Sequence, residues 1–281
     1  MHWTHKGALR RIGRTTACVC MKISLNADMG ESFGPYRMGD DQALMPYVSS
    51  ANIACGMHAG DPNVMAATID LAREHGVTIG AHPGFGDLHG FGRRRIPMTP
   101  PEIEHLVTYQ IGALQALAAG RDVRVEFVKP HGALNNMAHE ESDVADAVAR
   151  GIRAASRDLL FVANCLSEMT RAADRAGLQV VHEAYADRRY APDGRLLPRS
   201  APEAVIRDPA DAARQVLAML DAGCLIAADG TRLSTPIDTF CLHADEATAL
   251  EVAKGVRGEL DRTGIAVVAI AGPGGSRIGL T

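Results

Sequence analysis

Short apolar runs alternate with longer amphipathic segments along almost the whole chain. Seven of these runs are strand candidates, and several of them are apolar nearly throughout, which is typical of strands that are covered on both faces. They are Ile23–Ala27, Ala51–Cys55, Val77–Ala81, Val123–Val128, Leu159–Ala163, Leu178–Glu183 and Thr239–His243. Strands that alternate with helices in this way predict parallel pairing with right-handed crossovers, and therefore an α/β fold.

Four of the segments between the strands carry recognisable helix signals. Aspartate followed by proline, or a capping box with proline at the first helical position, marks the start, and glycine marks the end. The predicted helices run from Asp61-Pro62 to Gly76, from Thr99-Pro100 to Gly120, from Asp208-Pro209 to Gly223, and from Asp245 to Gly264.

Two further features decide the type of α/β fold. An eighth apolar run, Ile265–Ile270, could close a barrel or lie outside it, and Asp229-Gly230 predicts a small hairpin between Cys224–Ala228 and Thr231–Ser234. An open doubly wound sheet is an alternative, but no GxGxxG motif follows the first strand. We therefore expect a TIM-like (β/α) barrel of seven strands, formed as one domain by residues 21–281.

Composition and charge narrow the range of partners. The net charge of −4 gives no reason to expect binding to nucleic acid or to an anionic membrane, and no stretch approaches the roughly 20 apolar residues of a membrane span. Six cysteines occur without a CxxC pair, so zinc-ribbon and thioredoxin-type sites are not expected. Reduced thiols in the cytoplasm are the better interpretation for a chain of this length without a secretory signal.

Residues 1–20 differ from the rest of the chain. They contain Lys6 and three arginines but no acidic residue and no apolar core of a signal peptide. An organellar transit peptide is one interpretation. We favour an upstream extension that is dispensable for folding and activity, with Met21 as the functional start.

The polar residues that follow the strands are the main functional signal. Six of the seven strand ends carry an ionisable side chain, and the carboxyl ends of barrel strands converge on one rim, where barrel active sites lie. The residues are Asn26, Asp28 and Glu31; Cys55, His58 and Asp61; His82; Lys129 and His131; Asn164; His182, Glu183 and Asp187; and His243 and Asp245.

Each of these residues also has a purely structural interpretation. A histidine at a strand end is often a hydrogen-bonding residue, and Asp61 is a helix cap. Lys129 is either a cation for a substrate carboxylate, a base with a lowered pKa, or a partner of Asp28 or Glu183 in a buried ion pair. The joint pattern, rather than any single residue, indicates a site.

Two glycine-rich stretches, Gly80–Gly92 and Gly272–Gly275, do not match the phosphate loop GxxxxGK[ST]. Arg93, Arg94 and Arg95 follow the first stretch and could bind an anion, although a solvated loop is the simpler interpretation.

Several longer motifs occur in one order, and together they resemble those of the LamB/YcsF family over roughly Met21 to Gly264. Asn135 stands where the family usually has Tyr, and Ala244 stands where it usually has Gly. The motifs are Asn26-Ala27-Asp28-Met29-Gly30-Glu31, Ala51-Asn52-Ile53-Ala54-Cys55-Gly56, His58-Ala59-Gly60-Asp61-Pro62, Ile79-Gly80-Ala81-His82-Pro83, Gly90-Phe91-Gly92-Arg93-Arg94, Val128-Lys129-Pro130-His131-Gly132-Ala133-Leu134, Glu183-Ala184-Tyr185-Ala186-Asp187-Arg188 and Leu197-Pro198-Arg199-Ser200.

The resemblance implies a barrel related to polysaccharide deacetylase-like folds. It also implies the A-subunit role in an ATP-dependent 5-oxoprolinase, which opens the lactam of 5-oxoproline to L-glutamate together with 5-oxoprolinase subunits B and C. Those partners are expected to activate the lactam by phosphorylation, so that ATP is handled mainly by them. This agrees with the missing phosphate loop, because water delivery, proton transfer and carboxylate binding are what such side chains can supply.

The expected site residues fall into two groups, with no metal ligand assigned. Catalysis is expected from Asp28, His58, His82, Lys129 and His131. Substrate binding is expected from Asn26, Glu31, Asn52, Arg94, Glu183, Arg188 and His243.

Two other functions stay open. Asp28, His58, His82 and His131 could form a metal site of a stand-alone amidohydrolase or deacetylase, although their spacing matches no diagnostic ligand motif, and we expect no requirement for a tightly bound transition metal. A non-enzymatic carrier or regulator of a small metabolite is the second alternative. A homo-oligomer is also compatible with the sequence.

Overall fold

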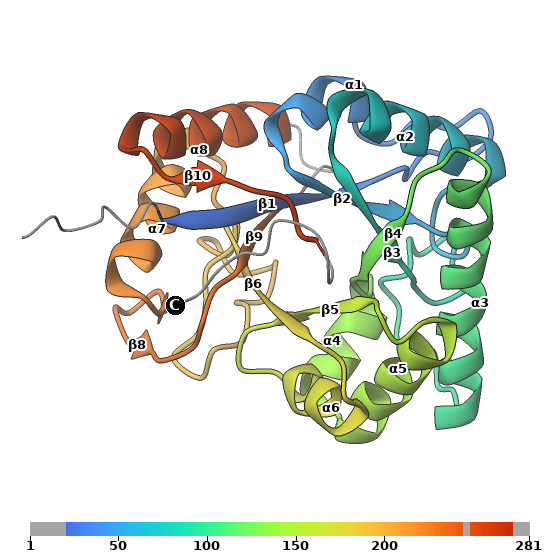
Figure 1. The fold of residues 1–281 in the computed structure, drawn as a ribbon. Helices are drawn as coiled ribbons and strands as arrows, with labels where there is room; N and C mark the ends of the chain where they lie inside the picture. The colour runs from blue at the N-terminus through green and yellow to red at the C-terminus, as the bar shows by residue number, and fades with distance from the viewer. Residues whose placement is uncertain (1–20, 244–247, 272–281) are drawn as a thin grey trace, which may run out of the picture.

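The computed structural model describes residues 21–243 and 248–271, and seven parallel strands form a closed barrel in it. Each strand pairs with the next, and the last, β9, pairs with β1 to close the ring (Figure 1). The strands are β1 (Lys22–Met29), β2 (Ser50–Ala54), β3 (Thr78–His82), β4 (Val125–Val128), β5 (Leu160–Asn164), β6 (Val180–Tyr185) and β9 (Thr239–Leu242). The predicted seven-stranded (β/α) barrel is confirmed.

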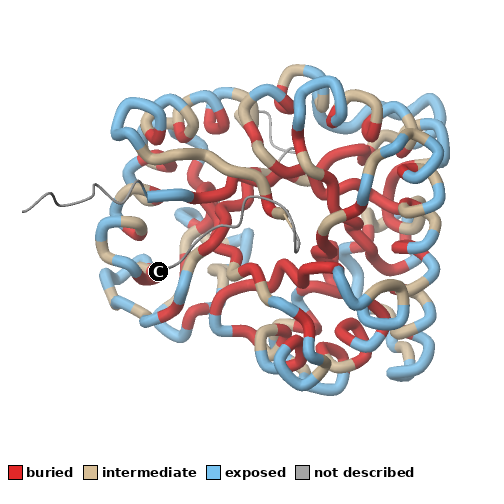
Figure 2. The backbone as a smooth tube through the Cα atoms, in the orientation of Figure 1, coloured by how far each residue is buried: buried red, intermediate tan, exposed pale blue. Residues whose placement is uncertain are grey.

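Helices surround the barrel and turn their polar faces outward, whereas the strands are buried on both sides (Figures 1 and 2). They are α1 (Asp41–Leu44), the 3-10 turn η1 (Met45–Tyr47), α2 (Pro62–His75), α3 (Pro100–Ala119), α4 (Gly132–Glu140), α5 (Ser142–Ala155), α6 (Glu168–Ala176), α7 (Pro209–Ala222) and α8 (Ala249–Thr263). The predicted start signals of α2 and α3 are present in the structure. Asp61 caps α2 by accepting from the backbone of Asn63 and Val64, and the capping box of Thr99 and Glu102 is formed.

Three smaller predictions have different outcomes. The eighth apolar run lies outside the closed ring: β10 (Ala266–Val267) pairs only with Lys22 and Ile23 at the start of β1. The hairpin is present as β7 (Leu225–Ile226) and β8 (Arg232–Leu233). Asp245, Ala244, the stretch Gly272–Gly275 and residues 1–20 lie outside the described residues, and α8 begins at Ala249.

The amino end of the barrel is filled by a small apolar cluster. It contains Phe127, Leu160, Val162, Val181 and, from the segment after β10, Ile270. The backbone N–H of Ile270 donates to Ser50 Oγ at 2.9 Å, which fixes that segment across the barrel opening. Gly80 makes room for the ring of Phe127, because a Cβ at Gly80 would lie 2.1 Å from a ring carbon. This end is therefore sealed by side chains.

Toward the carboxyl end the barrel interior becomes polar. Along β1, Leu25 and Ala27 belong to the large core between strands and helices, whereas Asn26 reaches Glu183 Oε1 across the barrel at 3.1 Å. Since side chains alternate along a strand, Asp28 points inward like Asn26. The inward positions of β1 are thus polar toward its carboxyl end, although the sequence of the strand is mostly apolar.

The described cysteines are buried and unpaired: Cys55, Cys165, Cys224 and Cys241. Burial raises the pKa of Cys55 and of Cys165 to about 12, so these two thiols are neutral near pH 7 and act as small core residues. Within the described residues, none of the helices has the length and apolarity needed to cross a membrane.

Replacing Ile270 by Ala should destabilise the protein by about 2–5 kcal/mol, because it leaves a cavity in the apolar cluster at the amino end. Chemical denaturation measures this change, with Leu88→Ala as the control, since Leu88 is 46% exposed. If the two variants were equally stable, Ile270 would not seal the barrel.

Candidate active site at the carboxyl end of the barrel

A cavity of about 420 Å³ opens at the carboxyl ends of the strands. Five basic side chains and two carboxylates line it, which gives it an excess of positive charge. The basic residues are Arg93, Lys129, Arg188, Arg195 and Arg199, and the acidic residues are Asp28 and Glu140. Such a pocket suits a small anionic molecule.

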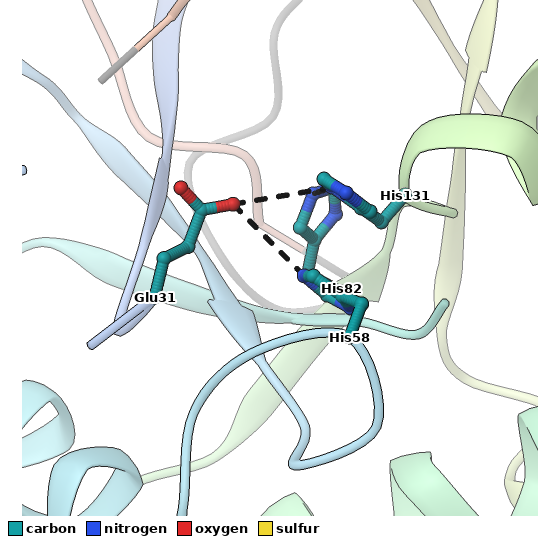
Figure 3. Close-up of side chains that lie close together, drawn as sticks. All are labelled: Glu31, His58, His82 and His131. Carbon is teal, nitrogen blue, oxygen red and sulfur yellow. Dashed lines mark hydrogen bonds and ion pairs between the residues drawn. The ribbon is translucent and has the colours of Figure 1, made fainter. Parts of the chain in front are cut away.

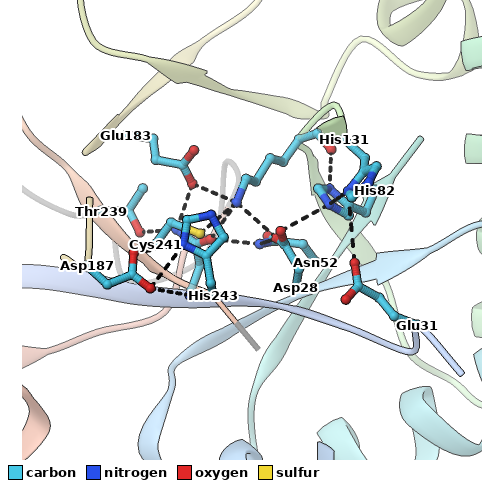
Figure 4. Close-up of polar contacts among 12 residues, drawn as sticks. Asp28, Glu31, Asn52, His82, His131, Glu183, Asp187, Thr239, Cys241 and His243 are labelled. Carbon is cyan, nitrogen blue, oxygen red and sulfur yellow. Dashed lines mark hydrogen bonds and ion pairs between the residues drawn. The ribbon is translucent and has the colours of Figure 1, made fainter. Parts of the chain in front are cut away.

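Lys129 lies at the floor of this cavity and is only 2% exposed. Its Nζ lies 3.0 Å from Asp28 Oδ1, 3.2 Å from Glu183 Oε1 and 2.9 Å from Cys241 Sγ. These three partners are labelled in Figure 4. Burial alone would lower the pKa of Lys129, but the two carboxylates and Cys241 raise it well above its ordinary value. These contacts favour the interpretation of Lys129 as a cation in a buried ion pair over that of a base with a lowered pKa.

Asp28 is held in its ionised form by contacts on both oxygens. Oδ1 accepts from Asn52 Nδ2 at 2.8 Å and from Lys129, and Oδ2 lies 3.3 Å from His82 Nε2. Burial would raise the pKa of Asp28, but His82 and Lys129 outweigh it and lower the pKa well below its usual value. A carboxylate fixed in this way can accept a proton only when its surroundings change.

Beside Asp28, four side chains converge: Glu31, His58, His82 and His131 (Figure 3). One ligand atom from each lies within 4.8 Å of the others, and all four residues are buried. His131 Nδ1 lies 3.0 Å from His82 Nε2, and Glu31 Oε1 lies 3.9 Å from both His131 Nδ1 and His58 Nε2.

Backbone carbonyls orient two of these rings. His82 Nδ1 lies 2.7 Å from the carbonyl oxygen of Lys129, and His131 Nε2 lies 2.8 Å from that of Phe91. His58 stacks on His131 with ring centroids 3.7 Å apart. Burial lowers the pKa of His131 to about 3 and that of His58 well below its ordinary value, so both rings are neutral near pH 7.

Glycines of the stretch Gly80–Gly92 make room for these rings. A Cβ at Gly84 would lie 2.7 Å from His58 Nδ1, and one at Gly92 would lie 2.6 Å from His58 Cβ. Gly92 also has a φ of +62°, which disfavours other residues. The stretch therefore forms the wall of the histidine cluster.

The opposite side of the cavity carries a second acid–histidine pair. His243 Nδ1 lies 2.8 Å from Asp187 Oδ1, and the His243 ring stacks on Tyr185 with centroids 5.3 Å apart. Burial would raise the pKa of Asp187, but His243 lowers it below its ordinary value. The carboxylate orients the imidazole at the cavity surface.

The cavity wall contains a charged group and hydrogen-bond acceptors that a bound molecule could contact. Arg188 donates to the backbone carbonyls of Leu197 and Ala204, which carry no charge to cancel its own. Asn135 Oδ1 and Asn164 Oδ1 are buried and accept no hydrogen bond from the described residues. Such buried acceptors normally have a donor, so a bound molecule with N–H or O–H groups would satisfy them.

The structure brings most of the predicted site residues together. Asp28, His82, Lys129, His131, Arg188 and His243 line the cavity; Glu31 and His58 lie directly behind His131; Asn26, Asn52 and Glu183 lie in the network around Lys129. The catalytic and binding roles of these residues stay predictions.

Arg94 is the exception, because it neither lines the cavity nor joins the groups around His131 and Lys129. Its guanidinium donates through Nε and Nη2 to the buried carboxylate of Asp87, which also accepts from the backbone of Gly90. Arg93 lines the cavity instead. Both residues follow the same glycine-rich stretch, and the sequence offers no signal that tells which side chain turns inward.

Several residues in or beside the cavity are not among the expected catalytic and substrate-binding residues. Asn164 and Asp187 stand at strand ends, Tyr185 and Arg199 lie within the family motifs, and Asn135 is a departure from the usual Tyr. Cys241 gives no signal beyond its place in the last barrel strand.

Comparisons with known proteins agree with the family resemblance of the sequence motifs. Residues 23–274 match the model of the LamB/YcsF family. A protein of Rhodopseudomonas palustris, named as the A subunit of 5-oxoprolinase, is 50% identical over 253 residues, which are 90% of this chain and 100% of the relative. The solved structure of a lactam utilization protein from Thermus thermophilus has a TM-score of 0.85 at 43% identity and covers 89% of this chain and 100% of that one.

A peptidoglycan N-acetylglucosamine deacetylase domain from Eubacterium rectale is also similar, with a TM-score of 0.46 and 9% identity over 88% of this chain and 87% of that one. This likeness is too weak to bear on function.

Replacing Asp87 by Asn should lower the melting temperature near pH 7 by loosening the loop that carries Phe91 and Gly92. The hydrogen bond from Arg94 lowers the pKa of Asp87 to about 2, from an ordinary value of 3.8. The stabilisation by the ionised form is complete above 3.8 and is lost as the pH falls toward 2. The difference in melting temperature from wild type should therefore shrink below about pH 4.

Melting curves across this pH range test the idea, with the exposed Asp221→Asn variant as the control. A difference that stays constant down to about pH 3 would contradict the assigned pairing.

Proposed function

The chain belongs to the LamB/YcsF family, and from this premise we propose that it is the A subunit of an ATP-dependent 5-oxoprolinase. Its reaction is the hydrolytic opening of the 5-oxoproline lactam to L-glutamate. The observation that carries the proposal is the Asp28 carboxylate, held between Lys129 and His82 at the floor of a cation-rich cavity.

The cavity has groups for each part of this substrate. 5-Oxoproline is a small anion with one carboxylate, one lactam N–H and one carbonyl oxygen. Arg93 and Arg188 supply positive charge for the carboxylate, and Asn135 Oδ1 and Asn164 Oδ1 supply acceptors for the N–H. The volume of about 420 Å³ exceeds what this small ring needs, so there is room for a phosphorylated form and for water.

Ring opening requires activation, because an amide is resistant to water. Phosphorylation of the lactam oxygen makes that oxygen a good leaving group. Water then adds to the same carbon and the ring nitrogen takes up a proton. The carbon–nitrogen bond breaks as the nitrogen takes up a second proton, and a second water hydrolyses the resulting acyl phosphate to a carboxylate and inorganic phosphate. Asp28 is placed to accept the proton of the attacking water, and Lys129 stabilises the negative charge that develops beside it.

ATP is handled by partner subunits in this proposal. The stretch Gly80–Gly92 surrounds the histidine cluster through Gly84 and Gly92, which argues against a role as a phosphate loop. The relatives are named as one lettered subunit of an enzyme, which implies further subunits. We assign activation of the lactam to subunits B and C and ring opening to this chain, and we expect the complex to work in the cytoplasm.

A stand-alone metal-dependent amidohydrolase is the second candidate. The cluster of Glu31, His58, His82 and His131 favours it, because imidazole and carboxylate groups around one point can hold a water-activating metal. It predicts hydrolysis of an amide without ATP and without partners.

The chain alone should form no glutamate from 5-oxoproline and ATP, whereas adding subunits B and C should give glutamate and phosphate. Replacing Asp28 by Asn in the complex should lower glutamate formation by about 100-fold or more, because it removes the carboxylate next to His82. Coupled assays of glutamate and phosphate measure both effects.

The exposed Asp221→Asn variant serves as the matched control, and size-exclusion chromatography checks that the Asp28→Asn complex assembles. Equal rates for the chain alone and for the complex would refute the division of labour. An active Asp28→Asn complex would refute the role of the carboxylate.

Replacing Asn135 by Asp should lower kcat/KM for 5-oxoproline by roughly tenfold or more, because it places a negative charge of nearly the same shape in a cavity built for an anion. Asn63→Asp, which changes an exposed residue outside the cavity, should leave kcat/KM unchanged. Steady-state kinetics of the complex with each variant measure the effect; unchanged kinetics for Asn135→Asp would place the substrate elsewhere.

A further inference from the structure

The histidine cluster contains a conflict that its own residues do not resolve. A carbonyl oxygen can only accept a hydrogen bond, so His82 Nδ1 and His131 Nε2, which face the carbonyls of Lys129 and Phe91, carry hydrogens. A neutral imidazole has one N–H. When both rings are neutral, the other nitrogens, His82 Nε2 and His131 Nδ1, point lone pairs at each other across 3.0 Å. A proton on His82 Nε2 would be shared between His131 Nδ1 and Asp28 Oδ2, which lies 3.3 Å away.

His58 adds a second unsatisfied group to the same place. The residue is 1% exposed, and neither of its ring nitrogens has a hydrogen-bond partner among the described residues. Its Nε2 faces Glu31 Oε1 at 3.9 Å. A single proton could bridge His82 and His131, but it would leave His58 without a partner. One cation among the four groups would satisfy all of them.

We propose that Glu31, His58, His82 and His131 form a binding site for one divalent transition metal ion. Three imidazoles and one carboxylate are the ligands that zinc and its first-row neighbours prefer, whereas calcium and magnesium prefer sets made of oxygen alone. The carbonyls of Lys129 and Phe91 hold the rings in the tautomers that a metal needs, which is the usual arrangement behind histidine ligands.

This inference replaces the expectation that no tightly bound metal is needed. It also differs from the ligand set considered from the sequence, which contained Asp28 in place of Glu31. Asp28 Oδ1 is bound to Asn52 and Lys129, and its Oδ2 faces His82. Glu31 lies among the three rings at the back of the cavity wall.

The position suggests the role of the ion. His82 and His131 line the cavity, whereas Glu31 and His58 do not. The ion would therefore lie in the cavity wall, on the side where His82 and His131 border the substrate space. Next to Asp28 it would lower the pKa of a bound water or polarise a substrate oxygen. This role rests on the proposed function, but the existence of the site does not.

The test measures metal binding directly. The full chain is stripped with a chelator and titrated with Zn²⁺ in a calorimeter and with Co²⁺ under visible spectroscopy. We expect one equivalent of each, with the intense visible absorption of low-coordinate Co²⁺. Glu31→Gln and His58→Gln should weaken binding by more than about 100-fold, since loss of even an outer partner costs about 10–100-fold.

His105→Gln, which changes an exposed histidine of α3, should bind like wild type. Circular dichroism confirms that each variant is folded, and two independent ligand variants keep the test valid if one of them unfolds. Absence of saturable binding, or wild-type affinity in a folded His58→Gln or Glu31→Gln variant, would overturn the site.

Two outcomes separate the metal site from the proposed function. If the ion binds but the reconstituted complex makes no glutamate, the metal site stands and the oxoprolinase assignment fails. If the complex makes glutamate with no metal bound to this chain, the assignment stands and the metal site fails.

Discussion

The buried ammonium of Lys129 is the interaction on which the rest of the site depends. An unpaired charge inside a protein is very costly, so a lysine that is 2% exposed must be neutralised by its neighbours. Asp28 and Glu183 do this from two different strands of the barrel. Asn26 and Asn52 donate to the same two oxygens, Glu183 Oε1 and Asp28 Oδ1, so the position of one cation dictates inward residues of three strands, β1, β2 and β6.

This network also explains how the barrel holds polar chemistry without losing its core. Outward-facing residues of the strands pack against the helices, and apolar residues fill the amino end of the interior. Between this apolar plug and the open cavity lies a layer of polar side chains that are linked through the ammonium group of Lys129. Such a layer is rigid because moving one member leaves another buried and unsatisfied. The side chains above it, Asp28 and His82, are consequently placed with little freedom.

The sequence was sufficient for the barrel and for the end at which the site lies, since strand patterns and the residues after them are local signals. It did not predict α4, α5 and α6. The residue that precedes each of these helices makes no capping side-chain hydrogen bond, so the usual start signal is missing. It placed Arg94 in the site, although the choice between Arg93 and Arg94 depends on the turn of a loop around Asp87. It gave no signal that Glu31, three positions beyond Asp28, would lie beside His58 and His131, because that position depends on how the chain turns after β1.

The apolar seal around Ile270 gives the barrel a single entrance within the described part of the chain. Substrate must then enter and product must leave through the same opening, one after the other. A protein that docked over that opening would decide both what is delivered and when it is released. An unstable, activated intermediate handed over in such a closed space would meet the catalytic groups before it met bulk solvent.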